Sequence, residues 1–262
     1  MVSPIGHQDR QPITYDDPWH WLAAGWRDLT RAPALSLGYG AVFSLVSFGI
    51  TFGLMRSGFH ALILPLAAGF MLVGPMLAVG LYEISRRLEA GEAVNLRAVL
   101  GNCKVCLPRV GWMGAALMLF LFAWMQIAAL LFMLFFGGEH YPAEPELLFS
   151  VLFYTPRGIA FVFVGSAVGA VLAVVVFAIS AISVPLLVER DIDIVGAAEI
   201  SIRVVRDNMR PMLLWAMLIA LFTAAGIATF FVGLIVTFPL IGHATWHAYR
   251  ALVRDRSLSV AD

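Results

Sequence analysis

Long apolar runs alternate with short charged stretches along this chain. Four of the runs, at 35–55, 59–82, 110–136 and 159–187, meet the length of roughly 20 apolar residues that a helix needs to cross a bilayer. A fifth run, 211–249, is too long for one crossing, and Gly226 lies near its middle. We therefore predict a reversal at Gly226 and two further spans, near 209–225 and 227–249, which makes six membrane helices.

The basic residues test this count of spans. The chain has 17 lysines and arginines, and with both termini cytoplasmic, six spans place all of them except Arg56 and Arg157 on the cytoplasmic side. Basic residues gather on that side in membrane proteins, and an odd number of spans would spoil the division. The sequence therefore predicts a multi-pass protein of the bacterial inner (plasma) membrane, with a membrane domain (19–253) between cytoplasmic N-terminal (1–18) and C-terminal (254–262) tails.

The stretches before the odd-numbered spans repeat one pattern. Each has apolar residues at helical spacing with basic residues between them, and each ends at a proline: Pro33, Pro108 or Pro211. Such a segment suits a helix lying in the headgroup layer, and proline is tolerated at a helix break or in a first turn. The predicted fold class is all-α: a polytopic membrane protein with six transmembrane helices as three hairpins, each preceded by an amphipathic interfacial helix, in an internal repeat.

The composition agrees with this fold class. Hydrophobic residues make up 61% of the 262 residues and charged residues 13%, against about 45–50% and about 25% in a soluble domain. The chain has too little polar side chain to coat a water-soluble globule of this size. We expect the lipid bilayer to be its main partner, with a membrane protein complex or a second copy of the chain (a homo-oligomer) as candidate protein partners, and no nucleic acid.

Two histidines four residues apart, His243 and His247, share a helical face at the end of the last apolar run. They are candidates for a metal or haem site, together with Glu83, which aligns with His247 in the repeat, because neutral imidazole binds zinc, copper and iron. The alternative is a polar and aromatic anchor at the membrane interface, formed with Trp246 and Tyr249. Only two ligands are certain neighbours, which favours the anchor.

Cys103 and Cys106 form a C-x-x-C motif on the second interfacial segment. Such a pair can bind a metal or exchange electrons. The chain has no second C-x-x-C to complete a four-thiolate site, which favours two unpaired thiols. A composite metal site of Cys103, Cys106, His243 and His247 is a further hypothesis, since all four are predicted at the cytoplasmic membrane face. No catalytic residue and no cofactor is otherwise indicated.

The second and sixth spans carry matching residues. Counted from Pro75 and from Pro239, an aromatic residue follows seven positions on and an arginine eleven positions on. Glycines in the second span indicate close helix packing. We predict structural or interface roles for a set of these positions: Gly74, Pro75, Gly80, Tyr82, Glu83, Arg86, Arg87, Pro239, Gly242, Trp246 and Arg250.

Three phrases of the sequence carry a family resemblance. They are PLAAGFMLVGPMLAVGLYEISRRLEAGE, SVPLLVERDIDIVGAAEISIRVVRDNMRPMLLWA and LIGHATWHAYRALV. Together they resemble the bacterial integral membrane family called domain of unknown function 2189, from about residue 19 to 253. Some members of that family carry a cytochrome c oxidase subunit label, but the family has no established function. A haem–copper catalytic subunit would need more intramembrane histidines than this chain has.

Three functional hypotheses follow. The first is a non-enzymatic accessory, assembly or scaffold protein for a membrane complex, with respiratory complexes among the candidates. The second is a channel or transporter for a neutral small solute, because no charged residue falls within the core of a predicted span and intramembrane charge is the usual mark of an ion path. The third is metal or haem binding at the cytoplasmic membrane face. The first hypothesis makes the protein a binding component and not an enzyme.

Overall fold

The computed structural model describes residues 13–137 and 145–253, so the predicted C-terminal tail and most of the N-terminal tail lie outside the described residues. Every regular element in the described part is a helix, which confirms the all-α class. In chain order the elements are α1 (Asp17–Arg31), α2 (Pro33–Arg56), the 3-10 turn η1 (His60–Leu62), α3 (Ile63–Leu77), α4 (Val79–Ala90), α5 (Leu96–Phe136), α6 (Pro145–Tyr154), α7 (Pro156–Ser180), α8 (Ser183–Glu189), α9 (Ile194–Asp207), α10 (Met209–Ala228) and α11 (Leu234–Val253).

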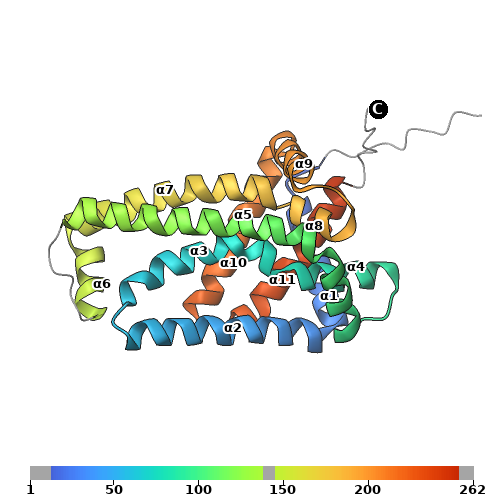
Figure 1. Cartoon of the computed structure of the whole chain (residues 1–262), viewed down its shortest axis with the longest axis horizontal. Coiled ribbons are helices and arrows are strands. Elements are labelled where there is room, and N and C mark those ends of the chain that lie inside the picture. The colour runs from blue at the N-terminus through green and yellow to red at the C-terminus, as the bar shows by residue number, and fades with distance from the viewer. Residues whose placement is uncertain (1–12, 138–144, 254–262) are drawn as a thin grey trace, which may run out of the picture.

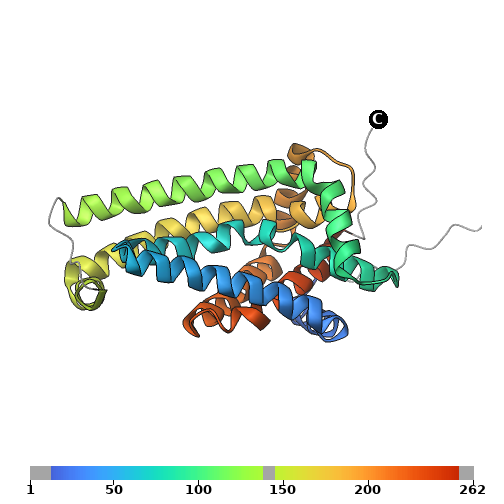
Figure 2. The same ribbon diagram turned by 60° about the horizontal axis from the view of Figure 1, so that its bottom comes forward.

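The long helices run side by side and the short ones gather at their ends. Helices α2, α3, α5 and α7 lie along the long axis of the molecule (Figures 1 and 2). Helices α1, α4, α8 and α9 lie together at one end, which we call the inner end, and α6 lies at the opposite, outer end (Figure 1). The C-terminal half of α11 reaches the inner end, where it packs extensively against α1.

Five helical segments of the described chain are long and apolar enough to cross a membrane: Pro33–Arg56, His60–Ala90, Val105–Phe136, Pro156–Glu189 and Met209–Ala228. They correspond to the first five predicted spans. Helix α11 is not among them, because its second half is rich in polar side chains. Most of α11 is buried by protein instead of facing outward. The arrangement of six spans in three hairpins therefore stays a prediction.

The predicted reversal at Gly226 is displaced in the structure. Helix α10 continues through Gly226 to Ala228, and the chain turns before α11 begins at Leu234. In the turn, Phe230 and Phe231 have positive φ values, and the Thr229 hydroxyl accepts a hydrogen bond from the Gly233 N–H (2.8 Å). Gly226 serves close packing, since a Cβ there would lie 2.5 Å from Leu234 Cδ2.

Two of the three predicted interfacial helices are separate elements, and the third is not. Helices α1 and α9 end just before Pro33 and Pro211, whereas α5 runs unbroken for 41 residues through Pro108. Its start is marked by Asn95, whose side chain caps the Ala98 N–H at 2.9 Å. A proline inside a helix removes one backbone hydrogen bond, which neighbouring groups in a membrane bundle can compensate.

Two of the membrane helices are broken near their inner ends. Helix α3 gives way to α4 at Ala78, and α7 gives way to α8 at residues 181–182. Side chains from neighbouring helices hydrogen-bond the backbone at both breaks. The Tyr39 hydroxyl donates to the Leu77 carbonyl (2.7 Å), while the Ser201 hydroxyl accepts from the Ile182 N–H (3.2 Å) and donates to the Ala178 carbonyl (2.7 Å). These breaks direct α4 and α8 into the inner end.

Candidate functional site

His243 lies at the centre of the inner end and is completely buried. Its Nε2 lies 2.9 Å from the Ser36 hydroxyl of α2, and its Nδ1 lies 2.8 Å from the Ser85 hydroxyl of α4. A neutral imidazole has one N–H donor and one acceptor nitrogen, and a serine hydroxyl can complement either. Both ring nitrogens are therefore occupied by hydrogen bonds that join α2, α4 and α11.

His247 lies one turn further along α11 and contacts α1. Its Nε2 lies 2.7 Å from Asp28 Oδ2, and the Asp28 side chain is only 6% exposed. Burial opposes the charged form of the Asp28 carboxyl and so acts to raise its pKa. Hydrogen bonds with His247 and Ser85 favour the charged form, as does the electrostatic interaction with the imidazoles of His247 and His243. These interactions outweigh burial and lower the pKa of Asp28. The two histidines thus have different partners, and the Asp28–His247 pair fastens α1 to α11.

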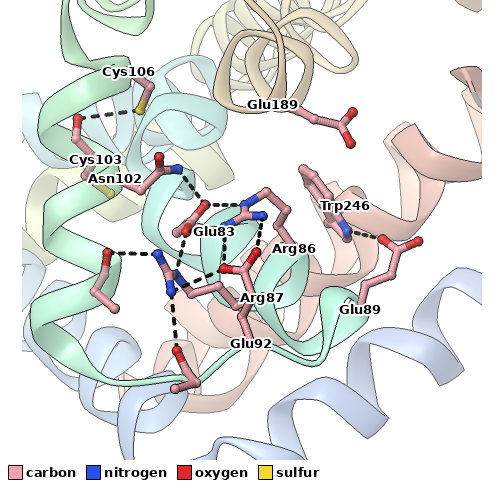
Figure 3. Close-up of polar contacts among 12 residues, drawn as sticks. Glu83, Arg86, Arg87, Glu89, Glu92, Asn102, Cys103, Cys106, Glu189 and Trp246 are labelled. Atoms are coloured by element: carbon pink, nitrogen blue, oxygen red, sulfur yellow. Dashed lines mark hydrogen bonds and ion pairs between the residues drawn. The ribbon is translucent and has the colours of Figure 1, made fainter.

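Glu83 is the most heavily bonded carboxylate of the inner end (Figure 3). It is fully buried and accepts hydrogen bonds from Arg86 Nε (2.8 Å), Arg87 Nε (2.6 Å) and Asn102 Nδ2 (2.6 Å). Arg86 also donates to Glu92, at 2.9 Å, and this hydrogen bond lowers the pKa of Glu92. A buried carboxylate is tolerated only when it is paired and hydrogen-bonded, and the cluster joins α4 to α5.

Arg250 makes the third polar cluster, near the end of α11. Its guanidinium donates to Glu189 of α8 (2.6 Å) and to Glu89 of α4 (3.2 Å). Glu89 also accepts from the Trp246 indole N–H at 3.1 Å (Figure 3), and Glu189 accepts from the Tyr249 hydroxyl. Two carboxylates on separate helices are thus held by one turn of α11.

These three clusters form what we call the inner polar network. It joins α1, α2, α4, α5, α8 and α11 through side chains far apart in sequence. Its members are Asp28, Ser36, Glu83, Ser85, Arg86, Arg87, Glu89, Glu92, Asn102, Glu189, His243, Trp246, His247, Tyr249 and Arg250.

The two cysteines lie on α5, next to the Glu83 cluster (Figure 3). Both are free thiols, and the Cys106 thiol donates to the Cys103 carbonyl at 3.5 Å. Burial raises the pKa of Cys103 to about 11, which keeps the thiol protonated at neutral pH. Within residues 13–137 and 145–253, no group of three or more histidine, cysteine or acidic side chains is placed to hold a metal. The structure does not gather the composite site of cysteines and histidines.

Most of the remaining predicted positions serve packing around this network. A Cβ on Gly80 would lie 2.6 Å from the Tyr39 ring, and one on Gly242 would lie 2.5 Å from Leu81 Cδ1. Tyr82 and Pro239 are buried in α4 and α11. Two further predicted positions, Gly74 and Pro75, lie away from the network and line an apolar cavity.

Two hollows occur beside these elements. The apolar cavity, of about 730 Å³, lies among α3, α5, α7, α10 and α11. The other hollow, of about 510 Å³, lies within the inner polar network, where Arg86, Glu89, Glu189 and Arg250 line it. The two have no lining residue in common. The apolar and polar hollows are therefore distinct features of the molecule.

Several members of the network are not among the residues that the sequence indicates, although they complete all three clusters. These residues are Asp28, Ser36, Ser85, Asn102 and Glu189. One signal was present for Asp28, since it follows Trp21 and Gly25 on the apolar face of α1, where a charge requires a partner. The serines gave no comparable signal, because a serine in an apolar span commonly bonds to its own helix.

The fold and the network define the class of protein: an α-helical integral membrane protein with the inner polar network at one end of its bundle. Residues 63–189 match the model of the family described as "Predicted integral membrane protein (DUF2189)". This match confirms the resemblance seen in the sequence, over just under half of the 262 residues. No curated protein and no solved structure matches the chain.

Proposed function

We propose that this protein is a non-enzymatic accessory or scaffold protein of the bacterial inner membrane, which supports the assembly of a membrane protein complex. The observation that carries the proposal is the inner polar network. Its histidines, acids and arginines are hydrogen-bonded in three clusters, which together involve six helices. A side chain held in this way positions helices, and the arrangement makes a rigid inner face.

The exposed surface of α1 supports a docking role for the inner face of the protein. Trp19 and Trp26 are each about half exposed on α1, with 53% and 51% of their surface accessible. Arg27 and Arg31 are exposed on the same helix. Aromatic residues and arginine are enriched where proteins bind one another. The partner in this proposal is a membrane protein, and respiratory complexes are among the candidates.

The proposal includes six membrane crossings with both termini cytoplasmic. Helix α11 would be the sixth crossing, paired with α10 as a hairpin. Its 20 residues extend about 30 Å at the rise of an α-helix, which is the thickness of the hydrocarbon layer. Because α11 is enclosed by α1, α2, α4 and α10, its polar half is not exposed to lipid. An enclosed helix does not need the apolar composition of a lipid-facing one.

The two other hypotheses have less support from the geometry. A channel for a neutral solute needs a continuous path, whereas the apolar cavity and the polar hollow share no lining residue. A metal or haem site at His243 needs a free imidazole nitrogen, whereas both nitrogens lie within 3 Å of serine hydroxyls. Binding metal there would require the imidazole to give up one of these hydrogen bonds.

Co-purification from native membranes in a mild detergent tests the proposal. We expect a membrane protein to co-purify in fixed stoichiometry with the wild type, and to be lost from a Trp19→Ala, Trp26→Ala variant. The matched control is Phe48→Ala with Phe52→Ala, a similarly exposed aromatic pair on α2, which should retain the partner. Recovery of lipid alone, or equal retention by both variants, would count against docking through α1. An absorbance band of bound haem would favour the third hypothesis instead.

A further inference from the structure

The apolar cavity is a slot inside the membrane-spanning part of the bundle. Its walls come mainly from α3, α5, α7, α10 and α11, and they are almost entirely hydrocarbon. Two hydroxyls at its inner end bond to their own helices: Ser180 donates to the Val176 carbonyl (2.7 Å) and Thr245 donates to the Ile241 carbonyl (2.8 Å). These hydroxyls are therefore satisfied without a polar ligand.

Small residues on α7 make the space. A stripe of small residues recurs at helical spacing along its cavity-facing side: Gly165, Ser166, Gly169, Ala170 and Ala173. A Cβ built on Gly165 would meet no atom within 4 Å, so this part of the stripe is not packed against a neighbouring helix. In many membrane proteins such a stripe lets two helices approach closely. Here the first part of the stripe borders open volume instead.

The slot opens sideways toward the bilayer. Its rim includes Leu213 and Met217 of α10, which are 50% and 61% exposed, and Leu64 near the outer end of α3, which is 56% exposed. All three residues lie within segments able to span the membrane. A molecule dissolved in the hydrocarbon layer can therefore reach the slot without passing through water.

The slot is long. Along α3 and α4 its lining extends from Leu64 to Tyr82, a segment that spans at most about 27 Å at the rise of an α-helix. The cavity volume is about 730 Å³. An extended alkyl chain is long and apolar enough to lie along these walls.

We propose that this slot binds one acyl chain of a membrane phospholipid, which enters from the bilayer beside α10. An apolar cavity does not retain water, and an empty one deprives its lining of dispersion contacts. An acyl chain supplies those contacts and needs no polar partner in the walls. This binding site is separate from the proposed docking face on α1, and the two can be tested independently.

Photolabelling in vesicles tests the acyl-chain site. The probe is a phosphatidylethanolamine with a diazirine midway along one acyl chain, at low abundance in vesicles of phosphatidylethanolamine and phosphatidylglycerol that contain the reconstituted full chain. Labelled residues are mapped by peptide mass spectrometry. We expect labelling of slot residues such as Gly165 and Ala173 to exceed, several-fold, labelling of the exposed α7 residues Phe163 and Val171. Equal labelling of both sets would mean ordinary surrounding lipid and would overturn the proposal.

Two matched variants sharpen this test. Ala170→Leu with Ala173→Leu fills the slot, and we expect it to lose the excess labelling of the lining. Ala160→Leu with Ala167→Leu makes the same change at two exposed positions of α7 away from the slot, and should label like the wild type. If the slot-filling variant folds and keeps the excess, the site is wrong. If it does not fold, the labelling ratio in the wild type decides alone.

Discussion

Single side chains at the inner end act mainly through the partners that bury them. Glu83 is fully enclosed, yet Arg86 and Arg87 retain 23% and 17% exposure of their side chains. The guanidinium groups are therefore partly hydrated, while the carboxylate with which they pair is shielded from water. Removing one partner of a buried ion pair costs more than the pair contributes, because the other charge stays desolvated.

Replacing Glu83 with glutamine should destabilise the fold. The amide cannot accept from Arg86, Arg87 and Asn102 as the carboxylate does, and we expect a loss of about 3 kcal/mol in the free energy of unfolding. The measurement is denaturant unfolding of the detergent-solubilised protein, followed by tryptophan fluorescence. Glu92→Gln is the control, because the Glu92 side chain is 40% exposed and a surface pair contributes at most about 1 kcal/mol. Equal effects of the two changes would contradict the burial argument.

Asp28 should make stability depend on pH at the acid end. Its pKa is lowered in the folded protein from the ordinary value of 3.8, so the folded state favours the carboxylate. The stabilisation is therefore complete above about pH 4 and is lost as the pH falls through the folded pKa. Asp28→Asn should have a lower melting temperature than the wild type at about pH 6, and the difference should shrink at about pH 3. A constant difference at both pH values would refute this.

At the scale of elements, the fold depends on close contact between helices distant in sequence. Helix α11 packs against α1, α2, α4 and α10, and small residues permit that contact. A Cβ on Gly40 of α2 would lie 2.4 Å from the Ile235 carbonyl oxygen of α11, whereas one on Gly49 of the same helix would meet nothing within 4 Å. The two glycines therefore have different structural roles.

Alanine substitutions at these two glycines should have opposite effects. Gly40→Ala must push α2 away from the α11 backbone, and we expect a lower melting temperature in detergent. Gly49→Ala replaces a glycine in the interior of an exposed helix, where alanine is favoured by about 0.5–1 kcal/mol, so its melting temperature should stay the same or rise. If both variants lose stability equally, the contact between α2 and α11 is not as close as described.

The helix break between α7 and α8 gives a second prediction at this scale. Ser201 of α9 bonds both to the Ile182 N–H and to the Ala178 carbonyl. Ser201→Ala leaves these buried groups unsatisfied, which should cost about 1–3 kcal/mol in unfolding free energy. Ser150→Ala is the control, because the Ser150 hydroxyl bonds only to the Leu147 carbonyl of its own helix. A loss at Ser201 no larger than that at Ser150 would show that the break is stabilised by other contacts.

For the whole molecule, the connections at the inner end predict its orientation in the membrane. The start of α5, the whole of α9 and the end of α11 lie at the same end of the bundle (Figure 1). Reporter fusions or cysteine labelling near residues 100, 205 and 253 should therefore place all three sites in one compartment. With arginine-rich connectors on the inside, that compartment should be the cytoplasm. Opposite compartments for residues 100 and 205 would disprove the six-span proposal.

The features of this structure that the sequence predicts are those set by whether each stretch of the chain prefers lipid or water. The long apolar runs had to become membrane helices, because a backbone in lipid must satisfy its own hydrogen bonds. Helices α2, α3 and α7 accordingly lie close to the predicted spans, and α1 and α9 were expected from their amphipathic patterns. The reversal after α10 was misplaced, since Gly226 marks close packing against Leu234 and the turn uses Phe230 and Phe231.

The amino-acid sequence by itself determined the class of protein, the membrane helices and the residue types that gather at one face. Only the tertiary structure decided which of those residues become partners. His243 is paired with Ser36 and Ser85, and His247 with Asp28, over separations of more than 150 residues. Local patterns report whether a residue prefers lipid or water, whereas pairing depends on how breaks and close contacts orient helices in three dimensions. Hence two neighbouring histidines resembled a ligand pair in sequence and have separate partners in the fold.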